Sequence, residues 1–159
     1  MDLEREGLPV VFYTDRGILK GKIALFEGSE VPDAVQLTHT GPPMVRLVDA
    51  SLLDFEFRVV LRAREMAVNK NAILFAYEDE QAADLTRLKG MISNEDYEAA
   101  AAEVERLLLT NQRDAELFYL SGLVFERFEG DPRARECFQK ALDLILDDKF
   151  RAVVSRHLA

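Results

Sequence analysis

The side chains that could do acid–base, nucleophilic or metal chemistry are sparse in this sequence and lie far apart. The two histidines, His39 and His157, fall in different halves of the chain, so neither half holds enough histidine for a metal centre or a catalytic triad. The eight glycines are scattered and form no phosphate-binding loop. We therefore expect no enzymatic activity, no metal site and no bound cofactor.

Acidic residues are abundant, but their clusters are typical of solvated ends of secondary-structure elements. One acidic run, residues 78–80, follows the last expected strand, and another, residues 147–148, precedes the last expected helix. Cys137 is the single cysteine, so the chain forms no disulfide within itself, and a half-buried structural thiol is the favoured interpretation. None of these groups indicates a reactive site.

Basic side chains repeat along the longest expected strand. On one of its faces Arg58, Arg62 and Arg64 could bind an anion or RNA. Proteins that bind single-stranded RNA usually add exposed aromatic rings, but the alternation predicts that Phe55 and Phe57 lie on the opposite, buried face. The favoured interpretation is therefore a solvated face, paired with acidic residues.

Composition narrows the classes of partner and compartment. The chain has 159 residues, a net charge of −9 and 48% hydrophobic residues, enough for a real core in one domain or two small ones. The negative charge disfavours nucleic acids and anionic membranes as partners. The start of the chain has no signal-peptide pattern, and no apolar run is long enough to span a bilayer. We expect a soluble cytoplasmic protein that does not bind membranes.

The first half of the chain has the alternation and the turn residues of short antiparallel strands. The expected strands cover residues 10–14, 18–26, 44–49, 55–68 and 72–77. Gly21 lies within the second of these, where a glycine often marks a sharp bend. Residues 27–43 fit either a short helical turn or a strand. Residues 1–79 therefore predict a small antiparallel β domain, either a strongly bent sheet or a closed barrel.

The second half contains two copies of a helix-pair pattern, residues 81–114 and residues 115–148, which are offset by 34 residues. In the clearer second copy, an apolar stripe is followed by a Gly-Asp-Pro break and a second stripe of small and aromatic residues. The residues that define this copy are Phe118, Gly122, Phe125, Ala134, Phe138 and Ala141. Gly122 has no side chain, so we expect the second helix to pack closely there.

These six residues resemble the tetratricopeptide repeat at its characteristic spacing. The second copy departs from that family at Ser121, where leucine is usual, and at Leu146, where proline is usual. The first copy is degenerate, with Leu88 in place of the glycine, and its second helix repeats the apolar stripe as Ala100, Val104, Leu107 and Leu108. The alternative is a plain helical hairpin whose spacing matches by chance.

A last amphipathic stretch from Phe150 to Leu158 resembles the single helix that closes many such arrays. We therefore predict an α+β chain of two domains, with an array of about five helices in residues 80–159. The first half resembles the opening of Sm-like barrels in VVFYTDRGILKGKIALF and LVDASLL, and it also resembles a small bacterial domain of unknown function with the same layout. That resemblance implies a fold and no activity.

The tetratricopeptide resemblance implies a groove that binds another protein or a peptide segment. The residues it places there are Leu85, Lys89, Ile92, Tyr119, Leu123, Glu126 and Arg127. The family's clamp for a C-terminal carboxylate needs lysine and asparagine at positions that Leu85, Lys89, Tyr119 and Leu123 occupy here, so that activity is not implied. Two repeats rarely bury a continuous core, so we expect the β domain or a second subunit to cover the first helix, with a homodimer favoured.

We therefore expect a non-enzymatic scaffold or adaptor. The alternative is a β domain that senses an anion, RNA or a small ligand, with the helices as its dimerising or output arm.

Overall fold

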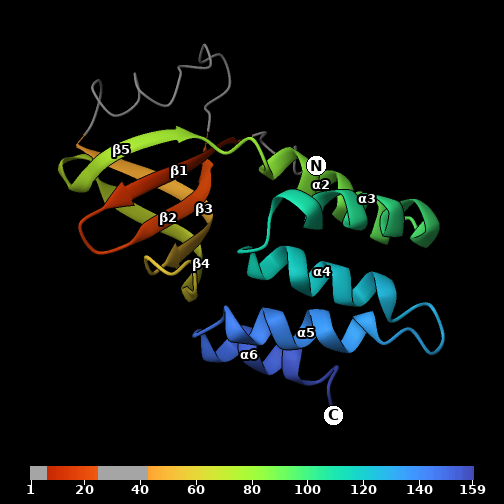
Figure 1. Ribbon diagram of the computed structural model, residues 1–159. Helices are drawn as coiled ribbons and strands as arrows, with labels where there is room; N and C mark the ends of the chain where they lie inside the picture. Colours follow the sequence, from red (N-terminus) through yellow and green to blue (C-terminus); the bar gives the residue numbers. More distant parts are fainter. Residues whose placement is uncertain (1–6, 25–42) are drawn as a thin grey trace. The chain divides into compact units, whose positions relative to one another are not determined.

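The computed structural model describes residues 7–24 and 43–159. A five-stranded antiparallel sheet comes first in the chain and five helices follow, which confirms the predicted α+β layout (Figure 1). The chain forms two compact units. The first contains residues 1–56 and 60–80, and the second contains residues 57–59 and 81–159.

The β unit contains five strands and one short 3₁₀ turn. They are β1 (Leu8–Thr14), β2 (Ile18–Ile23), β3 (Met44–Leu53), β4 (Val59–Asn69), η1 (Lys70–Ala72) and β5 (Ile73–Glu78). The strand order is β4-β3-β2-β1-β5, so the described strands form an open sheet with β4 and β5 at its edges. Residues 25–42 lie outside the described part of the chain. The choice between a helical turn and a strand for residues 27–43 falls almost entirely within them.

The core of the β unit lies on one face of this sheet. Val10, Phe12 and Leu47 are fully buried there, together with side chains from β2, β3 and β4. β2 pairs with both β1 and β3, and its register with β3 shifts between Lys20 and Lys22. Gly21 lies at this irregularity, as expected for a glycine at a bend.

The hairpin between β1 and β2 has the predicted turn. The Thr14 amide donates to the Gly17 carbonyl at 2.9 Å, and the Thr14 hydroxyl donates to the same oxygen at 2.9 Å. A methyl group on Gly17 would lie 2.4 Å from the Leu53 carbonyl oxygen, so only glycine fits where the turn meets β3.

The prediction for residues 55–68 was wrong in its start and in its buried face. Phe55 lies in a turn, where the Glu56 amide donates to the Asp54 carboxylate at 3.0 Å, and the strand begins only at Val59. Phe55 is 57% exposed, so it is not the buried residue that the alternation predicted. Leu61 is 45% exposed as well, because an edge strand has a neighbour on one side only.

The helical unit has the five predicted helices. They are α2 (Ala82–Ser93), α3 (Tyr97–Thr110), α4 (Ala115–Phe125), α5 (Arg133–Asp143) and α6 (Asp148–Ser155). Aspartates begin three of them: Asp96, Asp114 and Asp147 accept hydrogen bonds from amides in the first turns of α3, α4 and α6. The predicted second-helix stripe of the first copy is buried at Ala100, Val104 and Leu107.

The close approach of α4 and α5 depends on Gly122, as predicted. A methyl group on Gly122 would lie 2.5–2.8 Å from three ring atoms of Phe138, which is far inside van der Waals contact. In α2 the corresponding position is Leu88, whose side chain is fully buried. The first copy therefore has the Leu88 side chain at this position, whereas the second copy has a glycine there and the ring of Phe138 packs against it.

The second unit also contains a short segment from earlier in the chain, residues 57–59. The Val59 amide donates to the Leu144 carbonyl at 2.7 Å, and the Leu146 and Asp147 amides donate to the Val59 carbonyl at 2.7 and 3.0 Å. Arg113 lies over the Phe57 ring at 5.6 Å. The connection between α5 and α6 is therefore fixed by a parallel β-bridge between Ile145 and Val59.

Candidate functional site

Helix α4 leaves one stripe of its surface accessible. Eight of its eleven residues are buried, and the three that are not are Glu116, Tyr119 and Leu123. Their spacing of three and four residues puts them on one side of the helix. Two of the predicted partner-binding residues, Tyr119 and Leu123, are thus among the positions where α4 can reach a ligand at all.

Helix α2 contributes a second stripe beside the first. Leu85, Lys89 and Ile92 recur at the same kind of spacing, and Lys89 is exposed while the two apolar residues are half-buried. The Lys89 ammonium lies 2.7 Å from the Glu116 carboxylate, which joins α2 to α4. We call this surface the α2/α4 face, made of Leu85, Lys89, Ile92, Glu116, Tyr119 and Leu123.

Glu116 is the member of this face that the sequence analysis missed. It precedes Tyr119 by three residues, so helical spacing alone could have included it. The Lys89 and Glu116 side chains are 50% and 33% exposed, so their ion pair is screened by water and contributes at most about 1 kcal/mol to stability. A partner with its own charges could exchange for either group at little cost.

The orientation of Tyr119 is set by three rings around it. Its ring meets Phe150 edge-on at 5.7 Å, and the rings of Phe138 and His157 lie at 6.2 and 6.0 Å. His157 itself stacks on Phe138 at 4.6 Å, so this histidine packs against the other rings of the helical unit. A ring held from several sides loses little freedom when it binds a partner.

The other two predicted residues, Glu126 and Arg127, directly follow α4 and make contacts within the unit. The Glu126 carboxylate lies 3.1 Å from His157 Nδ1, and the Arg127 guanidinium lies over the Tyr97 ring at 5.0 Å. Glu126 therefore ties the end of α4 to the residues that follow α6, and Arg127 ties it to the start of α3. The α2/α4 face is the smaller set of residues without these two.

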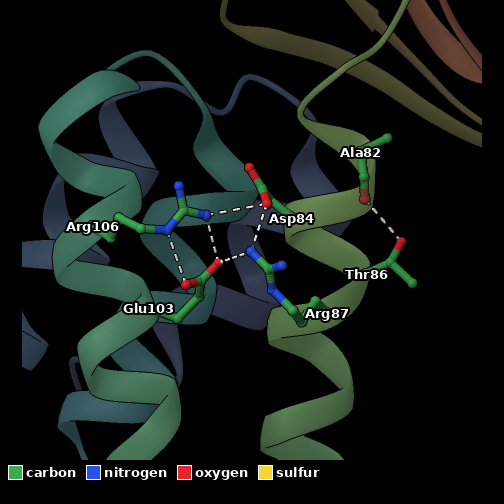
Figure 2. A network of polar contacts seen from close by, with 6 residues as sticks. All are labelled: Ala82, Asp84, Thr86, Arg87, Glu103 and Arg106. Carbon is green, nitrogen blue, oxygen red and sulfur yellow. Dashed lines mark hydrogen bonds and ion pairs between the residues drawn. The ribbon is translucent and has the colours of Figure 1, made fainter.

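A polar network fixes α2 against α3, on which the shape of the face depends. Figure 2 shows Arg87 and Arg106 each contacting both Asp84 and Glu103. The cross-helix distances are 2.5 Å from Arg87 to Glu103 and 3.1 Å from Arg106 to Asp84. Hydrogen bonds from Arg106 and then Arg87 lower the pKa of Glu103 to about 2, against the opposing effect of its partial burial.

The structure does not bring the three candidate anion-binding arginines onto one strand face. Arg62 and Arg64 are exposed and alternate along β4, but Arg58 precedes that strand and belongs to the second unit. The remaining candidate anion-binding pair is therefore Arg62 and Arg64.

The other titratable groups of the sequence analysis form no site. Cys137 is buried, and burial raises the pKa of its thiol. His39 lies outside the described residues. Within residues 7–24 and 43–159, no group of three or more histidine, cysteine, aspartate or glutamate side chains could hold a metal ion. In the same part of the chain, no helix has the length and apolar character needed to cross a bilayer.

Comparison with known proteins finds a likeness of fold among solved structures. No family model matches the chain, and no curated protein matches it. Among solved structures, the β region is similar to an Sm protein of Pyrococcus abyssii, solved in complex with a uridine heptamer. The identity is 17%, the TM-score is 0.33, and the alignment covers 47% of this chain and 87% of that one. A likeness of this extent says nothing about what the present chain binds.

Proposed function

We propose that this chain is a non-enzymatic interaction protein whose helical unit binds a protein or peptide segment on the α2/α4 face. The observation that carries the proposal is the burial of α4, which hides every residue except Glu116, Tyr119 and Leu123. In this proposal the helices are an array of the tetratricopeptide type, which the helix pairs, the Gly122 contact and the final helix support.

The chemistry of the face favours a partner with an apolar anchor. Leu85, Ile92 and Leu123 are half-buried, so a partner side chain would complete their burial. Tyr119 adds a ring that is already oriented and a hydroxyl that can hydrogen-bond, which is typical of residues that dominate binding energy. The Lys89–Glu116 pair supplies one charge of each sign beside them.

The test compares how strongly the Leu123→Lys and Leu109→Lys variants bind the partner. Leu123 lies on the face, whereas Leu109 is 82% exposed on α3 and serves as the matched control. Proteins bound by the unmodified chain in its native extract are identified, each is purified, and its dissociation constant is measured with both variants. We expect Leu123→Lys to weaken binding at least about tenfold and Leu109→Lys to leave it unchanged.

Circular dichroism of both variants establishes that each remains folded. A purified partner that binds both variants equally well would place its site elsewhere and overturn the proposal. Ile92→Lys on α2 provides an independent check, because it changes the same face without touching the rings around Tyr119.

A second candidate is an anion- or RNA-binding surface on the β unit. The observation that favours it is the exposure of Phe55, which leaves an aromatic ring in solvent in the same unit as Arg62 and Arg64. Stacking rings and basic side chains together are typical of sites for single-stranded RNA. If RNA binds here, Arg62→Glu with Arg64→Glu should abolish the anisotropy change of a fluorescent single-stranded RNA. Equal binding by the double variant would exclude these arginines.

A further inference from the structure

Strand β5 exposes three large apolar side chains. Leu74 is 66% exposed, Phe75 is 57% exposed and Tyr77 is 47% exposed. Simple alternation does not hold along β5, because its register with β1 shifts between Ile73 and Phe75, and Ile73 and Ala76 both pack against the core of the β unit. Large apolar side chains exposed together on one strand are typical of an interaction surface.

The outer edge of β5 is also open in the part of the chain that the structure describes. β5 is the last strand in the sheet order, and it pairs with β1 alone along Val10–Thr14. Natural edge strands usually avoid association by carrying charged residues, proline or a bulge that twists the edge away. Residues 73–77 of β5, with the sequence ILFAY, contain no charge, no proline and no glycine. The strand has one register irregularity against β1, between Ile73 and Phe75, and residues 75–77 beyond it pair regularly.

The aromatic residues next to this edge form a rigid cluster. The Tyr13 ring stacks on Phe75 at 4.5 Å with 17° between the planes, and Tyr77 lies 6.1 Å from Tyr13. Partial burial and then a hydrogen bond with Tyr13 raise the pKa of Tyr77 to about 12. The rings are therefore held by one another, while the outward side of Phe75 remains in solvent.

We propose that β5 is a self-association edge, along which two copies of this chain pair antiparallel across a two-fold axis. Pairing would join the two sheets through backbone hydrogen bonds and place the Phe75 ring of each copy against the aromatic cluster of the other. This inference goes beyond the proposed function, because it concerns the β unit and not the α2/α4 face.

The charges near β5 favour a second copy in the antiparallel orientation. The uncharged centre of the strand presents no like-charge repulsion to an identical strand. Three acidic residues lie together at one end of β5: Glu78 is its last residue, and Asp79 and Glu80 follow it. Antiparallel pairing puts the two acidic ends at opposite ends of the interface, whereas parallel pairing would put them side by side.

The other edge of the sheet fits an identical strand less well. β4 also exposes apolar residues, with Val60 at 40% and Leu61 at 45%. However, it carries Arg62, Arg64 and Glu65 in its centre, which is a usual way of protecting an edge. A two-fold pair of β5 strands needs no contribution from β4 and closes with two copies.

The decisive test is charge complementation at Phe75, read as molar mass by light scattering across a concentration series. Near a two-fold axis a residue meets its own counterpart or a close neighbour. Phe75→Lys and Phe75→Glu should therefore each raise the dimer dissociation constant by about 100-fold, because like charges then face each other. Mixing the two variants should restore a dimer, because the charges become opposite.

Matched controls separate this interface from other modes of association. Leu74→Lys changes the same strand at its register irregularity and should also weaken the dimer, whereas Val60→Lys on β4 and Leu109→Lys on α3 should not. A monomeric unmodified chain throughout the series would overturn the proposal. A dimer that Val60→Lys dissociates as strongly as Phe75→Lys, or that the mixture fails to restore, would also overturn it, because β5 would not then be pairing with itself.

Discussion

A methyl group on Gly122 would lie 2.5 Å from the ring of Phe138, so these two residues set how closely α4 and α5 approach. Phe138 is 1% exposed, and its ring also stacks on the ring of His157. The ring has little room to move away. This contact joins the two helices of the clearer repeat, and Tyr119 of the α2/α4 face packs against the same ring.

The first prediction concerns this contact. Gly122→Ala should destabilise the chain by about 1–3 kcal/mol, because overpacking against Phe138 outweighs the better helix propensity of alanine. Urea unfolding followed by circular dichroism measures the difference. Gly90→Ala is the matched control, since α2 leaves open space within 4 Å of that position, and it should instead stabilise by about 0.5–1 kcal/mol. Equal effects of the two changes would contradict the contact.

A second prediction concerns the pH dependence of stability. The pKa of Glu103 falls from 4.5 to about 2 on folding, so its ionised form stabilises the fold above pH 4.5 and this contribution is lost as the pH falls towards 2. Glu103→Gln should remove that part of the dependence. Because Arg87 and Arg106 are half-exposed, the effect should be about 1 kcal/mol.

The control for this measurement is Glu105→Gln on the same helix, whose side chain is 62% exposed. Unfolding free energies between pH 2 and 4.5 should differ less between this variant and the unmodified chain than they do for Glu103→Gln. The network of Figure 2 would lose its assigned role if the two variants followed the same curve.

A third prediction concerns the thiol of Cys137. Burial raises its pKa and closes it to reagents, so the native chain should react with a thiol reagent at least about 100-fold more slowly than the chain unfolded in urea. The measurement is the rate of colour release with a disulfide reagent at neutral pH. Rapid labelling of the folded chain would show that Cys137 is accessible and would reopen the question of a reactive cysteine.

A fourth prediction concerns the end of α5. Arg151 Nη1 donates to the carbonyl oxygens of Leu142, near the end of α5, and Ile145, just beyond it, at 2.8 and 2.6 Å. A cation therefore satisfies acceptors at the end of this helix. Arg151→Met should cost about 1.5–3 kcal/mol in the free energy of unfolding, because both acceptors lose a charged donor. Lys149→Met, at an exposed position on α6, the helix that also carries Arg151, should change stability by less than about 0.5 kcal/mol.

The helical half could be predicted from the sequence because its signals are local. The apolar stripes, the capping aspartates and the missing side chain at Gly122 all act within one or two helical turns. The turn that carries Phe55 could not be predicted in the same way. Phe57 adopts a φ of 65°, which has no signature in an aromatic residue, and the β-favouring composition of 55–68 extended the expected strand too early.

The candidate site shows the same division between local and distant contacts. The tetratricopeptide resemblance implied Tyr119, Leu123 and the α2 stripe as groove residues, and the structure leaves them at least partly accessible. Glu126 was expected on the same surface, but its carboxylate meets His157, which lies 31 residues further along the chain. A contact between residues so far apart in the sequence depends on how α6 packs against α4 and α5, and no local sequence pattern predicts that.

The segment 57–59 makes the two units interleaved along the chain, since the second unit holds residues that lie between two parts of the first. A fragment that starts at residue 81 would lack the Val59 carbonyl, which accepts from the amides of Leu146 and Asp147. Removing the first 80 residues is therefore not a clean separation of domains. During synthesis Val59 likewise appears well before its partners at residues 144–147, so α6 is anchored only after those residues have been made.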